Sequence, residues 1–423
     1  MFYLLFIAYT VLFCWLITRI KFFKQSGLGS RLLILLFLLR VVASLIGCYF
    51  NLYYYPFSDS LTFHKEGIIE FDILFNNPGE YFTNIFHDNY QNSYSGLMDT
   101  SKSFWNDTRS NLIIKMLSIF DIFSGKNFFI NTLFFNFLVF FGPVALYKVF
   151  DKIFFKSAYP LIACIFILPS ALFFSAMIHR DGLILLSLSM VVYHLFFIMR
   201  QPNFSVKRTL AVLFFLLLIF LLRNFVFITL LPAIIAWIIA NRNPKYALVI
   251  FMGIYSLTAI LFFGSSYISP KTDLPQYVSE RQIAFIEIAK TGASGIDINP
   301  LYPNIRSFFN NTPQALNHSL MRPYLSGIEN FNYLPFALEI ILYEIIILFF
   351  IFYRNKKSAI HPLAYFCIFF SLSMFLVIGY TIPIIGAIAR YRSIYFTFLL
   401  IPVFCYFDWK RFFNLAWIIK LNM

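Results

Sequence analysis

The chain contains a long succession of apolar runs, each about long enough to cross a bilayer as a helix. A hydrocarbon core of about 30 Å needs about 20 apolar residues in a helix, and the sequence offers about eleven such runs. They lie near residues 1–20, 32–51, 128–147, 158–178, 182–199, 209–222, 224–240, 246–264, 333–353, 360–380 and 393–408. The sequence therefore predicts an all-α polytopic membrane protein, a single domain over residues 1–423 with about eleven transmembrane helices.

The composition excludes a soluble globular protein. Only 12% of the residues are charged, against about 25% in ordinary soluble domains, and 60% are hydrophobic. The net charge of +14 does not indicate a nucleic-acid partner, because the basic residues are scattered between apolar runs. The 5 cysteines all lie in apolar runs without CxxC or Cys–His pairing, so neither a disulfide framework nor a zinc site is predicted.

The positions of Lys and Arg predict the orientation, because short cytoplasmic loops are enriched in both. One orientation places six basic clusters on the same side of the membrane. The clusters are Arg19, Lys21, Lys24 and Arg31; Lys148, Lys152 and Lys156; Arg200, Lys207 and Arg208; Arg242 and Lys245; Arg354, Lys356 and Lys357; and Lys410, Arg411 and Lys420. The N-terminus is then outside and the C-terminus is cytoplasmic.

This orientation leaves two long loops on the outer face, residues 52–127 and 265–332. Residues 61–75 and 277–290 have apolar side chains at three- and four-residue spacing with charges opposite. They are predicted to be amphipathic helices lying along the membrane surface. Long loops between packed helices are often functional, so the chemistry is expected there.

The first outer loop opens with YYYPFSDSLTFHKEG, which holds Asp59, His64 and Lys65. If a helix starts here, Asp59 is at or near its N-cap, where free N–H groups and the helix dipole stabilise a carboxylate. One interpretation is a plain helix cap, with His64 and Lys65 on a solvated face. The other is a catalytic site in which Asp59 is a general base or metal ligand and His64 assists.

The segment LPSALFFSAMIHRDGLILL places His179, Arg180 and Asp181 at the predicted outer junction of two apolar helices. Placing an ionisable residue between membrane spans costs free energy, so such residues are candidates for substrate binding. The alternative is a helix hairpin whose turn is simply polar.

Further arginines lie at predicted outer helix ends, where the positive-inside rule does not favour them. Arg223 is in IFLLRNFVFI, Arg390 and Arg392 are in ARYRSIYFTFLLIP, and Arg322 precedes another apolar run. Guanidinium groups match phosphate geometry, so an anionic substrate is predicted at this face. Anchoring to lipid headgroups is the alternative.

Together these segments resemble integral-membrane glycosyltransferases of the GT-C superfamily, which use polyprenyl-phosphate-linked sugars. SDSLTFHKEG resembles the acidic motif that opens their first large outer loop, where an Asp is the catalytic base. The second segment resembles the LPS-x-x-F-W-S-x-x-x-K-[DE] hairpin of bacterial members, and ARYRSIYFTFLLIP resembles their late RYR-x-P-x-x-P element. Two departures are that Arg180 replaces the hairpin Lys and that Asp59 follows the second predicted helix, not the first.

The resemblance implies an enzyme that transfers a hexosyl or pentosyl group in the bacterial cytoplasmic (inner) membrane. A polyprenyl-phosphate-linked sugar would be the donor, and a cell-envelope glycan, lipid or protein the acceptor, with membrane lipid around both. Asp59 would deprotonate the acceptor hydroxyl, and Arg180, Arg223, Arg390 and Arg392 would offset charge on the departing phosphate. No cofactor or metal ligand is assigned, because Asp59 has no DxD partner. A divalent metal nevertheless stays open.

Two alternatives remain open at this point. An O-antigen or exopolysaccharide polymerase has similar spans and loops, and Arg281, Arg306 and Arg322 in the second loop would suit it. A lipid-linked oligosaccharide flippase or transporter is less favoured, because the charged residues lie at loop starts. The sequence has no P-loop, no GxGxxG motif and no clear repeat.

Overall fold

The computed structural model describes most of the chain. It covers residues 2–56, 58–84, 104–154, 158–201, 203–268, 273–290, 294–327, 331–355 and 359–412. Across these ranges every regular element is a helix, which confirms the predicted all-α fold. The chain forms two compact units, Met1–Phe155 with Ile165–Phe227 and Lys156–Cys164 with Ile228–Met423, and we describe each by itself.

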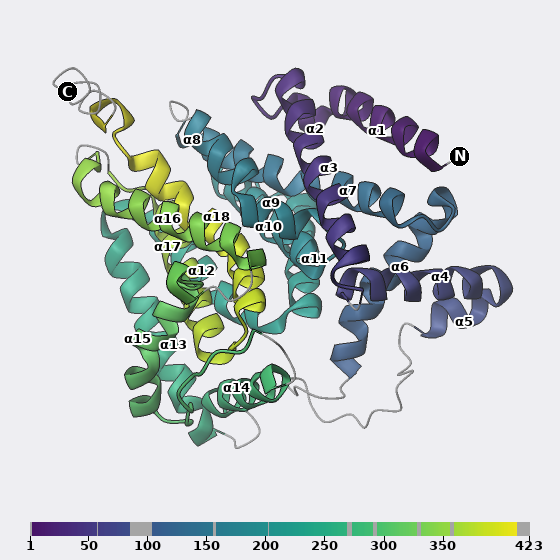
Figure 1. The fold of residues 1–423 in the computed structure, drawn as a ribbon. Coiled ribbons are helices and arrows are strands. Elements are labelled where there is room, and N and C mark those ends of the chain that lie inside the picture. The colour runs from purple at the N-terminus through teal and green to yellow at the C-terminus, as the bar shows by residue number, and fades with distance from the viewer. Residues whose placement is uncertain are drawn as a thin grey trace. The chain divides into compact units, whose positions relative to one another are not determined.

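The first unit is built around one central helix. Its helices are α1 (Phe2–Arg19), α2 (Lys21–Lys24), α3 (Ser30–Tyr53), α4 (Asp59–Asn76), α5 (Pro78–Thr83), α6 (Phe104–Ser124), α7 (Phe128–Asp151), α9 (Pro169–Ala176), α10 (Arg180–Arg200) and α11 (Val206–Leu222). Helices α1, α3, α6, α9 and α10 all pack on α7 (Figure 1). Helix α7 is apolar on nearly every face, as a helix enclosed by others must be.

A glycine allows the closest of these contacts. A Cβ atom at Gly142 of α7 would lie 2.8 Å from the Cα atom of Leu186 in α10, so only a residue without a side chain fits. Helices α7 and α10 therefore pack backbone to backbone along the middle of the unit.

The second unit contains helix α8 (Ala158–Ile162), most of α12 (Asn224–Arg242), and the helices that follow. These are α13 (Ala247–Ile268), α14 (Leu274–Lys290), α15 (Ile305–Leu320), α16 (Leu334–Tyr353), α17 (Pro362–Thr381) and α18 (Ile385–Tyr406). Helices α13, α14, α15 and α18 pack on α17 (Figure 1). A short π-helical segment, Ala163–Ile167, follows α8.

Nine helical segments in the described ranges are long and apolar enough to cross a membrane, which makes this a multi-pass membrane protein. They are Phe2–Arg19, Ser30–Tyr53, Phe128–Asp151, Arg180–Arg200, Asn224–Arg242, Pro244–Tyr267, Phe331–Tyr353, Pro362–Thr381 and Ile385–Tyr406. The predicted run 158–178 is a pair of helices bent by 46°, which raises the count to ten if the pair is one span. The run 209–222 lies in α11, which has 17 residues and is not among the candidates. The count of eleven is thus not confirmed.

Both predicted amphipathic segments are helical. Residues 61–75 lie within α4, and residues 277–290 lie within α14. The sequence analysis did not identify α5 and α6 in the first predicted loop or α15 in the second. Helix α15 is amphipathic, with polar and apolar side chains on different faces, but Pro313 inside it obscured the pattern.

A buried lysine holds α4, α5 and α6 together. The Nζ atom of Lys115 in α6 lies 2.5 Å from a carboxylate oxygen of Glu70 in α4 and donates a hydrogen bond of 2.7 Å to the Tyr81 carbonyl in α5. Both charged side chains are largely buried, so each depends on the other. This contact fixes α4 against α6 and thereby positions the first turn of α4.

Candidate functional site

The start of α4 joins the junction between α9 and α10. Ser60, in the first turn of α4, is fully buried, and its hydroxyl donates to the Ile178 carbonyl at 3.0 Å. The same hydroxyl lies 3.3 Å from Nε2 of His179, the N-cap residue of α10. The structure therefore brings together the two segments from which the sequence analysis predicted chemistry, although 119 positions separate these two residues.

Asp59 is the first residue of α4, directly after the N-cap residue Ser58. A carboxylate in the first turn is stabilised by the positive end of the helix dipole. Asp59 is therefore near the N-cap, as predicted, but is not itself the cap residue. The Asp59 side chain is exposed, whereas His64 is 8% exposed and faces the core. Five residues turn an α-helix by about 140° beyond one full turn, so the two side chains lie on different faces of α4. Lys65 is also exposed.

His64 belongs to a chain of buried polar side chains across α4, α6 and α7. The amide nitrogen of Asn131 lies 3.3 Å from Nδ1 of His64 and 2.7 Å from a carboxylate oxygen of Asp121. Ser124 donates to the same Asp121 oxygen at 3.3 Å. Because an amide nitrogen only donates, Nδ1 of His64 accepts and the ring is neutral. Burial lowers the pKa of His64 to about 4 and raises the pKa of the Asp121 carboxyl, because burial disfavours the charged form of each group.

The turn before α7 explains how this chain forms. Gly125 and Lys126 both have left-handed backbone conformations, with φ of 61° and 62°. The Asn127 side chain then caps α7 by accepting hydrogen bonds from the Phe129 and Ile130 N–H groups. The tight turn sets the last turn of α6, with Asp121, against the first turn of α7, with Asn131.

Asp181 and Arg223 form a buried ion pair. The guanidinium of Arg223, between α11 and α12, lies 2.7 Å from a carboxylate oxygen of Asp181 in the first turn of α10, and their side chains are 7% and 1% exposed. Gly182 allows α10 to begin so deep in the unit, since a Cβ there would lie 2.7 Å from the Phe135 ring. The pair neutralises both charges, as buried ions require.

Arg180 lies beside the first turns of α4. Its guanidinium donates to the Ser110 hydroxyl of α6 at 2.8 Å and lies 5.4 Å from the centre of the Phe63 ring. Asp59 and Phe63 are four residues apart and therefore neighbours on one face of α4. The half-buried Arg180 thus places a cation next to the face of α4 that carries Asp59.

The second unit holds the other predicted arginines. Arg392 is 3% exposed, and its guanidinium donates to the Ser319 carbonyl of α15 at 3.0 Å. Arg390 is half-buried and donates to the Tyr391 hydroxyl at 3.2 Å, while Arg322 lies 5.2 Å from the centre of the Tyr324 ring. Because these residues belong to the second unit, a common cavity for Arg390 with Asp59, Arg180 and Arg223 stays a prediction.

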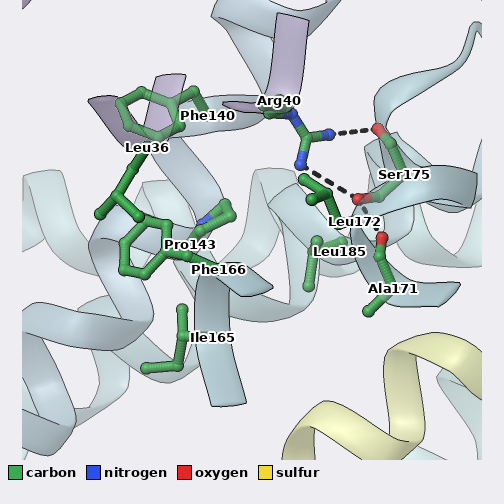
Figure 2. Close-up of a pocket in the computed structure, with 10 residues that line it drawn as sticks. All are labelled: Leu36, Arg40, Phe140, Pro143, Ile165, Phe166, Ala171, Leu172, Ser175 and Leu185. Carbon is green, nitrogen blue, oxygen red and sulfur yellow. Dashed lines mark hydrogen bonds between the residues drawn. The ribbon is translucent and has the colours of Figure 1, made fainter. Parts of the chain in front are cut away.

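The sequence analysis missed a buried arginine inside a membrane-spanning helix. Arg40 of α3 is 3% exposed, and its guanidinium donates to the hydroxyl of Ser175 at 3.1 Å and to the carbonyl oxygen of the same residue (Figure 2). The cavity beside it has a volume of about 10 Å³, about the smallest that holds one water molecule. Arg40 therefore ties α3 to the end of α9. A lone charge within an apolar run was the signal for it.

In the residues that the structure describes, no three His, Cys, Asp or Glu side chains come together to hold a metal ion. The chemistry that the arrangement offers is that of an exposed carboxylate at the start of α4, a half-buried guanidinium beside the first turns of the same helix, and a buried polar framework across α4, α6 and α7. Comparisons with protein-family models, with curated proteins and with solved structures found no match for this chain.

Proposed function

We propose that this protein is an integral-membrane glycosyltransferase of the GT-C type. It moves a hexosyl or pentosyl group from a polyprenyl-phosphate-linked donor to a cell-envelope glycan, lipid or protein acceptor at the outer face of the bacterial cytoplasmic membrane. The observation that carries the proposal is the bonding of Ser60, next to Asp59, to the Ile178–His179 turn, with Arg180 beside the same helix. These are the segments in which the sequence resembles that superfamily.

In the proposed reaction, Asp59 accepts the proton of an acceptor hydroxyl while the hydroxyl oxygen attacks the anomeric carbon. The bond between that carbon and the lipid phosphate breaks, and the phosphate oxygen keeps the electron pair. Arg180 donates hydrogen bonds to the developing charge. His64 is enclosed behind α4 and has a positioning role, as does the Asp181–Arg223 pair.

The proposed topology has eleven spans, outer loops at 52–127 and 265–332, an outer N-terminus and a cytoplasmic C-terminus. Contacts within the first unit support it. The helix ends that the topology assigns to the outer face are joined by the Ser60–His179, His64–Asn131 and Asp181–Arg223 contacts. Helix ends that contact one another in this way must lie on the same side of the membrane, as the proposed topology has them.

Asp59→Asn tests the proposal, because Asn keeps the size of Asp but cannot accept the proton. Purified protein is reconstituted with radiolabelled polyprenyl-phosphate sugars, and product is quantified at equal amounts of folded protein. A general base predicts a loss on the order of 10² to 10⁴-fold. Asp72→Asn at the other end of α4 is the control, since it removes only an exposed ion pair with Lys126. Asp59→Asn activity within about fivefold of wild type, far short of that loss, removes Asp59 from the role.

A polymerase is the second candidate, because helices α14 and α15 of the second predicted loop pack on α17. The Ser319 carbonyl of α15 also accepts a hydrogen bond from Arg392 of α18. The same assay separates the two functions: a transferase adds a single sugar, whereas a polymerase gives a ladder of products. A flippase gives no glycosidic product, and Asp59→Asn leaves its lipid export intact.

A further inference from the structure

A polar cavity lies in the first unit between the C-terminal ends of α7 and α10 and the N-terminal end of α11. Its volume is about 390 Å³, within the range of about 300–1,000 Å³ typical of ligand pockets. Three cationic side chains line it, Lys148, Lys152 and Arg208, against the single carboxylate of Asp151. The cavity therefore carries an excess of positive charge.

Two of the cations in this cavity lie beside the same aromatic ring. Lys148 is 8% exposed, and its ammonium lies 5.3 Å from the centre of the Tyr193 ring, while the guanidinium of Arg208 lies 5.7 Å from the centre of the same ring. In the described part of the chain, none of the three cations forms an ion pair with a carboxylate. Lys152 is exposed, whereas Lys148 is buried and Arg208 is half-buried. Like charges in such surroundings repel, so an anion between Lys148 and Arg208 would relieve that repulsion.

The buried ammonium also has hydrogen-bonding capacity to spare. Lys148 donates one hydrogen bond, of 3.1 Å, to the Phe22 carbonyl, and an ammonium carries three N–H groups. A purely structural role, as a cap for that carbonyl and for the negative end of α7, accounts for this lysine but not for Arg208 and Lys152.

We propose that this cavity binds a phosphate group, carried either by an anionic phospholipid or by a soluble phosphate compound. Arg208 offers paired donors that match phosphate oxygens, and the two lysines add point charges. Basic pockets between membrane helices suit such headgroups.

The cavity is separate from the candidate catalytic site. Asn131 and Lys148 lie 17 positions apart on α7, which corresponds to about 26 Å along a helix. Arg180 and Asp181 likewise begin α10, whereas Tyr193 lies in its second half. The proposal therefore does not rest on the proposed glycosyltransferase activity.

The test measures the thermal midpoint of the full-length protein in an uncharged detergent while a ligand is added. One arm adds inorganic pyrophosphate, and the other adds phosphatidylglycerol with phosphatidylcholine as its neutral reference. A saturable rise of the midpoint with either anionic probe is expected. A response to pyrophosphate alone identifies a soluble ligand, to phosphatidylglycerol alone a lipid, and to both a shared phosphate site. No response to either overturns the proposal.

Lys148→Gln and Arg208→Gln should each raise the half-saturating concentration on the order of tenfold, the effect of one lost charge-assisted hydrogen bond. Arg200→Gln, an exposed arginine at the end of α10 that does not line the cavity, is the matched control and should bind like wild type. Asp151→Asn should tighten binding, which keeps the proposal testable if the lysine variant does not fold. Two outcomes overturn the proposal. In the first, Lys148→Gln, Arg208→Gln and the control Arg200→Gln weaken binding equally. In the second, Asp151→Asn binds like wild type and so does Lys148→Gln or Arg208→Gln.

Discussion

At the scale of single residues, several buried polar groups are arranged in pairs and chains. Asp181 with Arg223, and Asp121 with Asn131 and His64, all lie where helix ends meet. Such groups favour one packing of the helices, because any other packing would bury them without partners.

The Asp181–Arg223 pair should be costly to break from one side only. Asp181→Asn leaves a buried guanidinium without its counter-charge, and the expected loss of unfolding free energy is about 3–5 kcal/mol. Replacing both residues by apolar ones of similar size should recover most of that loss. The exposed Lys126–Asp72 pair is the matched control, and its removal should cost at most about 1 kcal/mol. Denaturant titration in micelles measures both; equal costs would show that the Asp181–Arg223 pair is well solvated.

His64 should make the protein less stable in acid. The folded chain holds His64 neutral down to a pKa of about 4, while the unfolded chain takes up the proton near the ordinary pKa of 6.5. Between pH 4 and 6.5 the unfolded state therefore binds more protons than the folded state. The contribution of His64 to the free energy of unfolding is complete above pH 6.5 and declines as the pH falls towards 4. Buried His318, whose pKa is also lowered to about 4, acts in the same direction, and Asp121, with its raised pKa, acts in the opposite one.

The variant His64→Gln isolates the contribution of His64 to the pH dependence of stability, because Gln can still accept a hydrogen bond from Asn131 and does not titrate. Its thermal midpoint should fall less than that of wild type between pH 7 and about pH 4.5, the window in which a neutral buried histidine loses stability. Lys65→Gln, its exposed neighbour on α4, should leave the pH dependence of wild type unchanged. A full wild-type decline in His64→Gln would contradict the neutral buried state.

At the scale of helices, glycines decide where two backbones touch. A Cβ at Gly379 of α17 would lie 1.9 Å from the Ala315 carbonyl oxygen of α15, a rigid backbone atom. Gly379→Ala must therefore push the two helices apart and lose their packing, at an expected cost of about 3 kcal/mol or more. In α13, a Cβ at Gly253 meets nothing within 4 Å.

Gly253→Ala is accordingly the matched control, and it should raise stability by up to about 1 kcal/mol, because Ala has the higher helix propensity. Thermal unfolding of both variants in the same detergent measures the difference. If Gly379→Ala is as stable as Gly253→Ala, α15 and α17 do not pack as described.

At the scale of the whole molecule, the proposed topology assigns each loop to one side of the membrane. Ser95 and Thr291 in the predicted outer loops and Ser358 in a predicted cytoplasmic loop would suit labelling, but they lie outside the described residues. Glu80 and Asn310 are exposed in the two predicted outer loops, and Asn203 is exposed in a predicted cytoplasmic one. Native cysteines interfere little, since all five are buried or half-buried.

Cysteines introduced at Glu80 and Asn310 should react with an impermeant thiol reagent added to intact cells, and one at Asn203 should react only after lysis. This follows from the basic clusters on the cytoplasmic side. The opposite pattern would place Asp59 in the cytoplasm and exclude the proposed acceptors at the outer face.

The sequence by itself determined the helical, multi-pass character of this protein and most of its helix positions. Each apolar run predicts a helix locally, because a backbone in lipid must satisfy its own hydrogen bonds. Every predicted run overlaps helical residues, whereas α11 and the bent pair at 158–176 show that length alone did not give the number of spans. The first turn of α4 was also predictable, from the acidic residue at a helix start.

Only the tertiary structure decided which polar residues meet. Asp121, Asn131, Ser60 and Arg40 carry no local signal of their partners, because hydrogen bonds between helices depend on helix rotation and packing. The same packing turned His64 into the core and left Asp59 exposed, although they are close in sequence. Gly142 and Gly379 likewise admit a neighbouring backbone, and their effect appears only when both helices are in place.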